Sequence, residues 1–203
     1  MERVGQGIDR AIIFGASGGI GAALVAELIA RGAGTVFATS RTLPEDLPDG
    51  AQWVRFDLDD EDTIAAAAET VGSPVDCAIV ASGLLTLPDG TGPERSYKQI
   101  DADAMARGFH LNTIGPALVA KHFLPLLPRD RRSLFAALSA RVGSIGDNRI
   151  GGWHSYRASK AALNMLIRNY AIELGRTHSQ AVCVALHPGT VDTALSEPFQ
   201  ANL

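Results

Sequence analysis

A tyrosine and a lysine four residues apart are the side chains of this sequence best suited to moving a proton. Tyr156 and Lys160 lie in the segment SYRASK at 155–160. On a helix, positions i and i+4 share a face, so both side chains can point into one cleft. A free tyrosine has a pKa of about 10, and a nearby ammonium group favours the phenolate. We therefore expect Tyr156 to act as a general acid or base near neutral pH, with Lys160 lowering its pKa.

Such a pair is common on helices and gains meaning only from a cofactor site upstream, which a glycine-rich turn near the start of the chain can supply. The turn follows the apolar segment 11–14, a predicted strand, and precedes a helical pattern over 20–31. A helix N-terminus offers N–H groups to a pyrophosphate, and glycines allow a close approach. Serine at position 17 departs from the Gly-x-Gly-x-x-Gly form of the motif. The alternative to cofactor binding is a glycine turn that serves only the packing of the strand against the helix. The predicted cofactor contacts here are Gly15, Ser17, Gly18, Gly19, Ile20 and Gly21.

The end of the second predicted strand indicates which dinucleotide binds. At this place an acidic residue would bind the ribose 2′-hydroxyl of NAD, whereas an arginine suits a 2′-phosphate. The strand over 35–39 is followed by Ser40 and Arg41 and has no acid at its tip. The guanidinium of Arg41 offers a fork of donors to a phosphate, and Ser40 adds a hydroxyl. NADP(H) is therefore favoured over NAD(H), the alternative being that Arg41 is an ordinary surface residue.

Apolar runs alternate with helical patterns along the whole chain, which predicts a parallel sheet covered on both faces. We expect a single α/β domain over 1–203, a Rossmann-type doubly wound parallel sheet in three α/β/α layers with strand order 3-2-1-4-5-6. This architecture usually has a seventh strand, and no strand pattern follows Ser196. Whether a C-terminal strand and the end of the substrate loop are missing from this sequence is therefore an open question. The predicted strands are 11–14, 35–39, 52–56, 75–81, 134–138 and 181–186, and the later helices are a segment capped by Asp59 or Asp60 and ending near Val71, 103–127 with an interruption near Gly115-Pro116, and 155–175.

Composition excludes several other classes of protein. The net charge is −4 with no long run of one sign, which argues against nucleic-acid binding. No apolar stretch reaches the roughly 18 residues of a membrane helix, and the first residues lack a signal-peptide pattern. Cys77 and Cys183 lie in apolar runs and are interpreted as buried thiols of a cytoplasmic protein, and no cluster has metal-ligand spacing.

The order of these motifs resembles the short-chain dehydrogenase/reductase family over residues from about 10 to 196. The resemblance is carried by the glycine turn, Asn112, the region of Ser139, the Tyr156–Lys160 pair and Pro188-Gly189. The segments 138–148 and 156–164 are similar, more narrowly, to the bacterial C-factor and sniffer-type carbonyl reductase branch.

This resemblance implies a role for further residues. Tyr156 would be the catalytic acid/base, Lys160 would also bind the nicotinamide ribose, and Asn112 would hold a water that links Lys160 to solvent. The two long helices over 103–127 and 155–175 would pair in a homodimer, the alternative being that they bury their apolar faces on the sheet alone. The further cofactor contacts implied are Asp57 and Leu58 at the adenine, Ala81, Ser82 and Gly83 beneath the cofactor, and Pro188, Gly189, Val191 and Thr193 at the nicotinamide end.

Two departures from the family pattern leave alternatives open. The serine that polarises the substrate is usually the second of a Ser-Ser pair, which here is Ser139-Ala140, so either Ser139 or Ser144 takes that role, with Ser139 favoured. The Asn-Asn-Ala-Gly segment after the fourth strand is replaced by residues 80–83, which removes two amides.

The predicted activity is the NADP(H)-dependent interconversion of a small-molecule carbonyl and an alcohol. One alternative is a cofactor-binding signalling or sensor protein of the C-factor type with little catalysis, which Ala140 and the missing amides motivate. An epimerase or dehydratase ranks lower, since the chain is too short for the added substrate domain. The substrate itself is not predicted, because its specificity depends on the loop after Pro188-Gly189.

Overall fold

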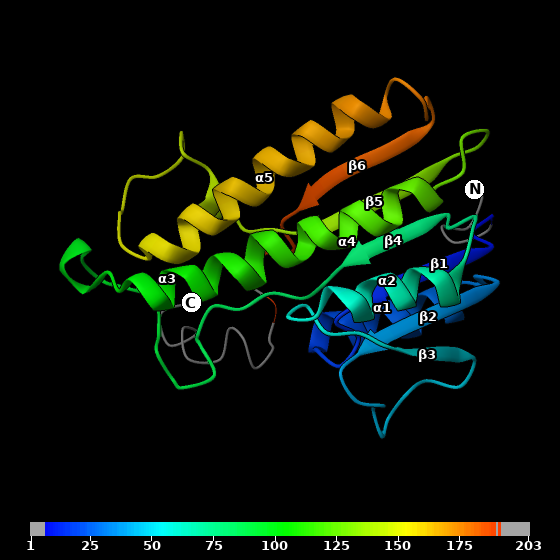
Figure 1. Ribbon diagram of the computed structural model, residues 1–203, viewed down its shortest axis with the longest axis horizontal. Helices are drawn as coiled ribbons and strands as arrows, with labels where there is room; N and C mark the ends of the chain where they lie inside the picture. The colour runs from blue at the N-terminus through cyan, green and yellow to red at the C-terminus, as the bar shows by residue number, and fades with distance from the viewer. Residues whose placement is uncertain (1–6, 190, 192–203) are drawn as a thin grey trace.

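A six-stranded parallel sheet organises the part of the chain that the structure, a computed structural model, describes, which is residues 7–189 and 191 (Figure 1). The strand order is β3-β2-β1-β4-β5-β6, and all five neighbouring pairs are parallel. The predicted doubly wound α/β fold and its strand order are therefore confirmed. The strands are β1 Arg10–Phe14, β2 Thr35–Ser40, β3 Ala51–Arg55, β4 Cys77–Val80, β5 Ser133–Leu138 and β6 Ala181–Leu186.

Helices cover both faces of this sheet and make it the middle of three layers. Alternate residues of β1 show the division: Ile12 and Phe14 pack with α2, α4 and α5, whereas Ala11 and Ile13 pack with α1. In Figure 1, α4 and α5 lie side by side in front of the sheet, and α1 lies behind it. The helices are α1 Gly19–Ala30, α2 Glu61–Val71, α3 Ala102–Phe109, α4 Gly115–Phe123 and α5 His154–Leu174, with short 3₁₀ turns at Tyr97–Gln99, Leu124–Leu126 and Arg141–Gly143.

Aromatic packing fixes the centre of the larger core at the end of β1. The ring of Phe14 lies 5.1 Å from that of Phe56 and 4.7 Å from that of Phe123 in an edge-on arrangement. Edge-to-face contacts at such distances stabilise aromatic pairs beyond the burial of their area. These contacts hold β1, the end of β3 and α4 together directly beneath the glycine-rich turn.

The long helix predicted over 103–127 is interrupted close to the predicted place, Gly115-Pro116. A π-helical segment, His110–Ile114, joins α3 to α4 just before Gly115 and Pro116. Pro116 occupies the first turn of α4 and lacks an N–H, which leaves a carbonyl of the preceding turn without its usual partner. The wider π turn therefore lies one turn upstream of the proline, and it carries Asn112.

The structure also selects between the two predicted caps of α2. Asp60 is the N-cap residue, and its carboxylate accepts a hydrogen bond of 3.1 Å from the backbone N–H of Asp62. Asp59 instead lies in a separate ionic cluster described below. None of the helices in the described part of the chain is long and apolar enough to cross a membrane.

Candidate active site

A cavity of about 360 Å³ opens at the carboxyl ends of the central strands, where the strand order reverses between β1 and β4. Open α/β sheets bind ligands at this point, and the volume falls within the usual range of small-molecule pockets. All thirteen residues between positions 15 and 83 that were predicted to contact a cofactor line it. Six further residues line it that the sequence did not single out: Phe56, Asp59, Leu84, Pro88, Arg107 and Leu111.

The glycine-rich turn brings the backbone of β1 against the start of α1. Gly15 has a φ of +85°, and a Cβ there would lie 3.0 Å from the backbone nitrogen of Ser82. A Cβ on Gly21 would lie 2.1 Å from the carbonyl oxygen of Gly15. Gly18, the N-cap residue, has no side chain to occupy the first N–H groups of α1. The turn therefore leaves these donors for an anion, as pyrophosphate binding requires.

Replacing Gly21 by alanine is expected to damage this turn. The added methyl group meets a backbone atom that cannot rotate away, and overpacking of this kind costs about 1–3 kcal/mol of stability. We expect a lower denaturation midpoint and weaker dinucleotide binding, measured by chemical unfolding and by fluorescence titration with NADPH and with NADH. Gly146→Ala is the matched control, since a Cβ at Gly146 meets nothing within 4 Å. Equal behaviour of the two variants would contradict the close approach seen at Gly21.

The polar groups of the cavity fit a dinucleotide. The hydroxyl of Ser82 is buried and has no hydrogen-bond partner among the described residues, although it lines the cavity. Buried polar atoms in proteins are nearly always hydrogen-bonded, so this hydroxyl marks a place for a polar ligand. A helix N-terminus, a glycine cradle and such a hydroxyl are together the donor set that phosphates and a ribose require.

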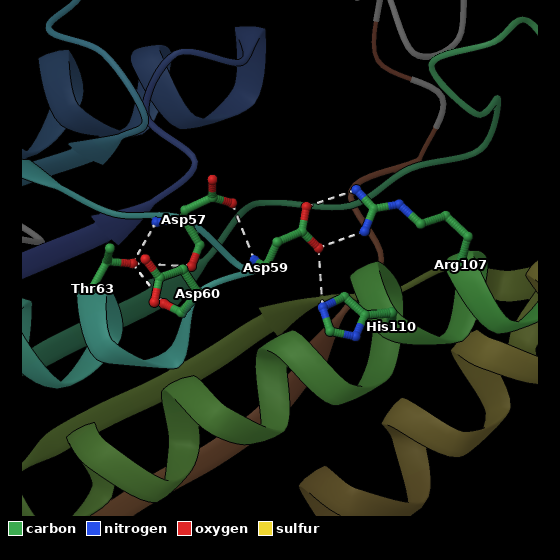
Figure 2. Close-up of polar contacts among 6 residues, drawn as sticks. All are labelled: Asp57, Asp59, Asp60, Thr63, Arg107 and His110. Atoms are coloured by element: carbon green, nitrogen blue, oxygen red, sulfur yellow. Dashed lines mark hydrogen bonds and ion pairs between the residues drawn. The ribbon is translucent and has the colours of Figure 1, made fainter.

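Asp59 and Arg107, which line the cavity at its expected adenine end, belong to an ionic cluster that Figure 2 draws. Asp59 holds both guanidinium nitrogens of Arg107 at 2.5 and 2.7 Å, and the ring of His110 lies 3.0 Å from the same carboxylate. The hydrogen bond from Arg107 is the main reason why the pKa of Asp59 is held below its usual value. Asp57 lies beside this cluster and accepts a hydrogen bond from the backbone of Asp59 at 3.1 Å. The cluster ties the loop after β3 to α3.

The two arginines that line the cavity differ in whether a carboxylate binds their guanidinium group. Arg107 is paired with the Asp59 carboxylate, whereas Arg41 is exposed and makes no hydrogen bond within the described part of the chain. Arg41 interacts with Asp59 only at longer range. The hydroxyl of Ser40, in contrast, donates to the carbonyl of Thr42 at 2.6 Å and accepts from Trp53 at 3.0 Å. Of the two predicted phosphate ligands, Arg41 thus has donors available, and Ser40 has its hydroxyl engaged.

The structure brings Tyr156 and Lys160 together on α5. The Lys160 ammonium nitrogen lies 5.8 Å from the centroid of the Tyr156 ring and donates to the carbonyl of Leu138 at 2.9 Å. Burial lowers the pKa of Lys160 to about 8, and burial also raises the pKa of Tyr156 above its usual value. The pKa of Tyr156 therefore departs in the direction opposite to the one that the sequence led us to expect, because the protein removes the phenol from water.

Asn112 lies where the two halves of the site meet. A Cβ on Gly83 would lie 3.3 Å from both the Asn112 carboxamide oxygen and the Lys160 nitrogen, so these groups converge beneath the end of β4. The Asn112 side chain pairs with the backbone of Leu84 through two hydrogen bonds, each 2.8 Å long. In this structure the amide thus braces the segment after β4. Its predicted role in holding a water remains a prediction.

The two candidate serines lie in different surroundings. Ser139 follows β5 directly, is half-buried, and donates from its hydroxyl to the side-chain oxygen of Asn164 at 2.7 Å. Asn164 is four residues beyond Lys160 on α5, which extends the i, i+4 face that carries the predicted site. Ser144 is exposed and accepts a hydrogen bond of 3.3 Å from the backbone of Asp147. This placement favours Ser139, with Asn164 as a partner that the spacing alone would have indicated.

A second cavity of about 460 Å³ lies beside the phenol of Tyr156. Its walls come from the segment 84–95, from α3 and from the start of α5, and Asn112 also lines it. The sequence had directed attention to the segment after Pro188-Gly189 for the substrate. Pro188, Gly189 and Val191 are exposed, and Thr193 lies outside the described residues. The segment 84–95 was missed because it carries no motif.

Comparison with known proteins agrees with this fold. The profile of the short chain dehydrogenase family matches residues 9–203. An uncharacterised oxidoreductase of Schizosaccharomyces pombe is 31% identical over 196 residues, covering 91% of this chain and 74% of that protein. C-signal of Myxococcus xanthus is 36% identical over 134 residues, covering 66% of this chain and 76% of that protein.

Two solved structures resemble the chain along most of its length. The NADPH-bound carbonyl reductase from chicken fatty liver is 27% identical with a TM-score of 0.78, covering 93% of this chain and 78% of that one. The carbonyl reductase Sniffer of Drosophila melanogaster has a TM-score of 0.81 at 22% identity, covering 92% and 83%, and shows the shared fold. This chain belongs to the short-chain dehydrogenase/reductase family and is an oxidoreductase of that family. Its relatives include C-signal, and sniffer-type reductases are among its structural neighbours, in line with the predicted branch.

Proposed function

We propose that this protein interconverts a small-molecule carbonyl and a primary or secondary alcohol with NADP(H). The observation that carries the proposal is the convergence of Tyr156, Lys160 and Asn112 at the end of a cavity with a dinucleotide's donor set. The cavity beside Tyr156 gives the substrate a place next to the phenol. A Tyr156→Phe variant that keeps more than about a tenth of the wild-type kcat would remove the basis of the proposal.

Each side chain has a role that follows from its position. NADPH, when bound, supplies the hydride that the carbonyl carbon receives. Tyr156 donates the proton that the carbonyl oxygen needs, and its raised pKa keeps the phenol protonated at neutral pH. The hydroxyl of Ser139 orients the same oxygen by a hydrogen bond once its proton turns from Asn164 to the substrate. In alcohol oxidation Tyr156 takes the proton back, and the charge of Lys160 then favours the phenolate.

We infer a preference for NADP(H) from Arg41. A hydrogen bond between charged groups contributes about 1.5–3 kcal/mol, so Arg41→Ala is expected to raise the Kd of NADPH by about 10- to 100-fold. The Kd of NADH should change little, because it lacks the 2′-phosphate. Fluorescence titration with both cofactors measures this, and Arg129→Ala, an exposed arginine away from the cavity, is the control. An equal loss for both cofactors would contradict the assignment.

A cofactor-binding sensor with little catalysis is the second candidate. The similarity to C-signal and the alanine at position 140 favour it. This candidate requires tight NADPH binding with no reduction of aldehydes, ketones or quinones over a broad panel. The position of Tyr156 favours the enzyme, because its phenol lines a second cavity that offers a substrate a place beside a group able to transfer a proton.

We also infer a cytoplasmic homodimer. Met165 and Ile172 are seven residues apart on α5 and therefore lie on the same face of the helix. Their side chains are 62% and 47% exposed. Ile114, at the junction with α4, is 47% exposed as well, and such apolar side chains favour burial against a second copy. Cys77 and Cys183 are free thiols, as a reducing compartment allows.

A further inference from the structure

Glu94 is a buried carboxylate outside the motifs, on the segment between β4 and α3, and it is 9% exposed. Its two oxygens accept hydrogen bonds from the backbone N–H of Ser155 at 3.1 and 3.3 Å, and one also accepts from the Ser155 hydroxyl. Its own carbonyl accepts from the backbone N–H of Trp153 at 2.5 Å. Ser155 directly precedes Tyr156, so Glu94 contacts the first turn of the helix that carries the predicted acid/base.

The start of α5 needs a partner of this kind. Its N-cap residue, Trp153, has a left-handed backbone (φ 52°, ψ 43°) and makes no side-chain capping bond. The first N–H groups of a helix have no intrahelical acceptors, and a negative charge there is favourable to the helix dipole. Glu94, 61 residues away from Ser155 in the sequence, supplies both the hydrogen-bond acceptor and the negative charge.

The carboxylate is charged when it makes these contacts. Burial acts to raise the pKa of Glu94, but the hydrogen bonds from the Ser155 hydroxyl and from backbone groups outweigh burial, and the pKa lies below its usual value. The nearby His154 acts in the same direction.

Two contacts thus hold the segment 84–94 at both ends. Asn112 pairs with the backbone of Leu84 at its start, and Glu94 binds Ser155 at its end. Leu84, Glu94 and Ser155 all line the cavity beside Tyr156. The segment is therefore fastened to both helices of the site, and its position decides where that cavity lies relative to the phenol.

We propose that Glu94 is a positioning residue, which fixes the first turn of α5 and the wall of the second cavity so that Tyr156 faces a bound carbonyl. This inference rests on the proposed function. Glu94 does not line the cofactor cavity, and it takes no part in the proton transfer itself. It acts through its hydrogen bonds with Ser155 and Trp153.

The test compares Glu94→Ala with Glu94→Gln in the full chain, using NADPH and the best carbonyl of a panel. Because displacement by about 1 Å can cost 10²-fold in rate, we expect Glu94→Ala to lower kcat/KM by about 10- to 100-fold. The Kd of NADPH should stay within about twofold, because only Leu84 and Pro88 of the segment 84–94 line the cofactor cavity and its glycine-rich turn lies elsewhere. Glu94→Gln should recover most of the loss, since its amide oxygen still accepts from Ser155. Glu69→Ala, an exposed glutamate on α2, is the control.

Two results would overturn the inference: wild-type kcat and KM in Glu94→Ala, or a glutamine variant as impaired as the alanine variant. If Glu94→Ala does not fold, Ser155→Ala replaces it, with an expected loss of about 2- to 10-fold in kcat/KM from one missing hydrogen bond. An unchanged kcat/KM there would overturn the inference as well.

A second readout separates this inference from the proposed function. If the wild type binds NADPH but reduces no carbonyl, the proposed function fails, and the emission of Trp153 is measured in a Trp53→Phe background. The Trp153 ring lies 6.2 Å from that of Tyr156 and moves with the turn that Glu94 fixes. A shifted emission in Glu94→Ala that Glu94→Gln restores supports the positioning role, and an unchanged emission overturns it.

Discussion

Tyr156→Phe is expected to lower kcat for carbonyl reduction by about 10²- to 10⁴-fold, the usual contribution of a positioned general acid. The variant removes only the phenolic oxygen, and the ring keeps its packing against Trp153. The Kd of NADPH and the melting temperature should therefore stay close to those of the wild type. Steady-state kinetics, a fluorescence titration and a thermal melt measure the three quantities on the same preparation.

The matched control is Tyr97→Phe, at an exposed tyrosine that lines neither cavity. It should retain the wild-type kcat. If Tyr156→Phe kept more than about a tenth of the wild-type kcat, acid catalysis by this phenol would be wrong. The group that donates the proton would then have to be sought elsewhere in the cavity.

Lys160→Met is expected to lower kcat/KM by about 10²-fold, because it removes a preorganised charge from a buried position beside the phenol. The wild-type rate should also depend on pH through this group. Since burial lowers the Lys160 pKa to about 8, the ammonium charge is present below that pH and is lost as the pH rises through it. The wild-type rate should therefore fall above about pH 8, and the methionine variant should lack this decline.

Unfolding would not explain such a loss. A lysine whose pKa is lowered by burial destabilises the folded state at every pH where it is charged, so methionine should leave the melting temperature at pH 7 unchanged or higher. Lys98→Met, at an exposed lysine on a 3₁₀ turn, is the control. An unaltered pH profile in Lys160→Met would show that a different group sets the decline.

Most of the fold could be predicted because continuous apolar runs and glycine turns are local signals. The strand Ala181–Leu186 was predicted with its observed bounds. The strand predicted over 75–81 is shorter, Cys77–Val80. The reason is that the backbone N–H of Val75 donates to the carbonyl of Leu126 and not to a neighbouring strand. A run of apolar residues does not reveal which of them pair with a neighbouring strand.

The parts of the site that the sequence did not predict depend on contacts between distant residues. Asp59 and Arg107 are 48 residues apart, and Glu94 and Ser155 are 61 apart, without any motif at either end. The direction of the Tyr156 pKa was missed for a related reason. The spacing of Tyr156 and Lys160 predicts their proximity, whereas desolvation depends on everything that packs around them.

The central claim is tested most directly by following the hydride itself. NADPH carrying deuterium at the hydride-bearing carbon of the nicotinamide is incubated with the protein and a panel of aldehydes, ketones and quinones, and the products are analysed by mass spectrometry. The proposed function predicts an alcohol with one deuterium on the former carbonyl carbon, formed by the wild type and by Tyr97→Phe and formed about 10²- to 10⁴-fold more slowly by Tyr156→Phe. Tight binding of NADPH with no deuterated product from any member of the panel would contradict it and favour the sensor.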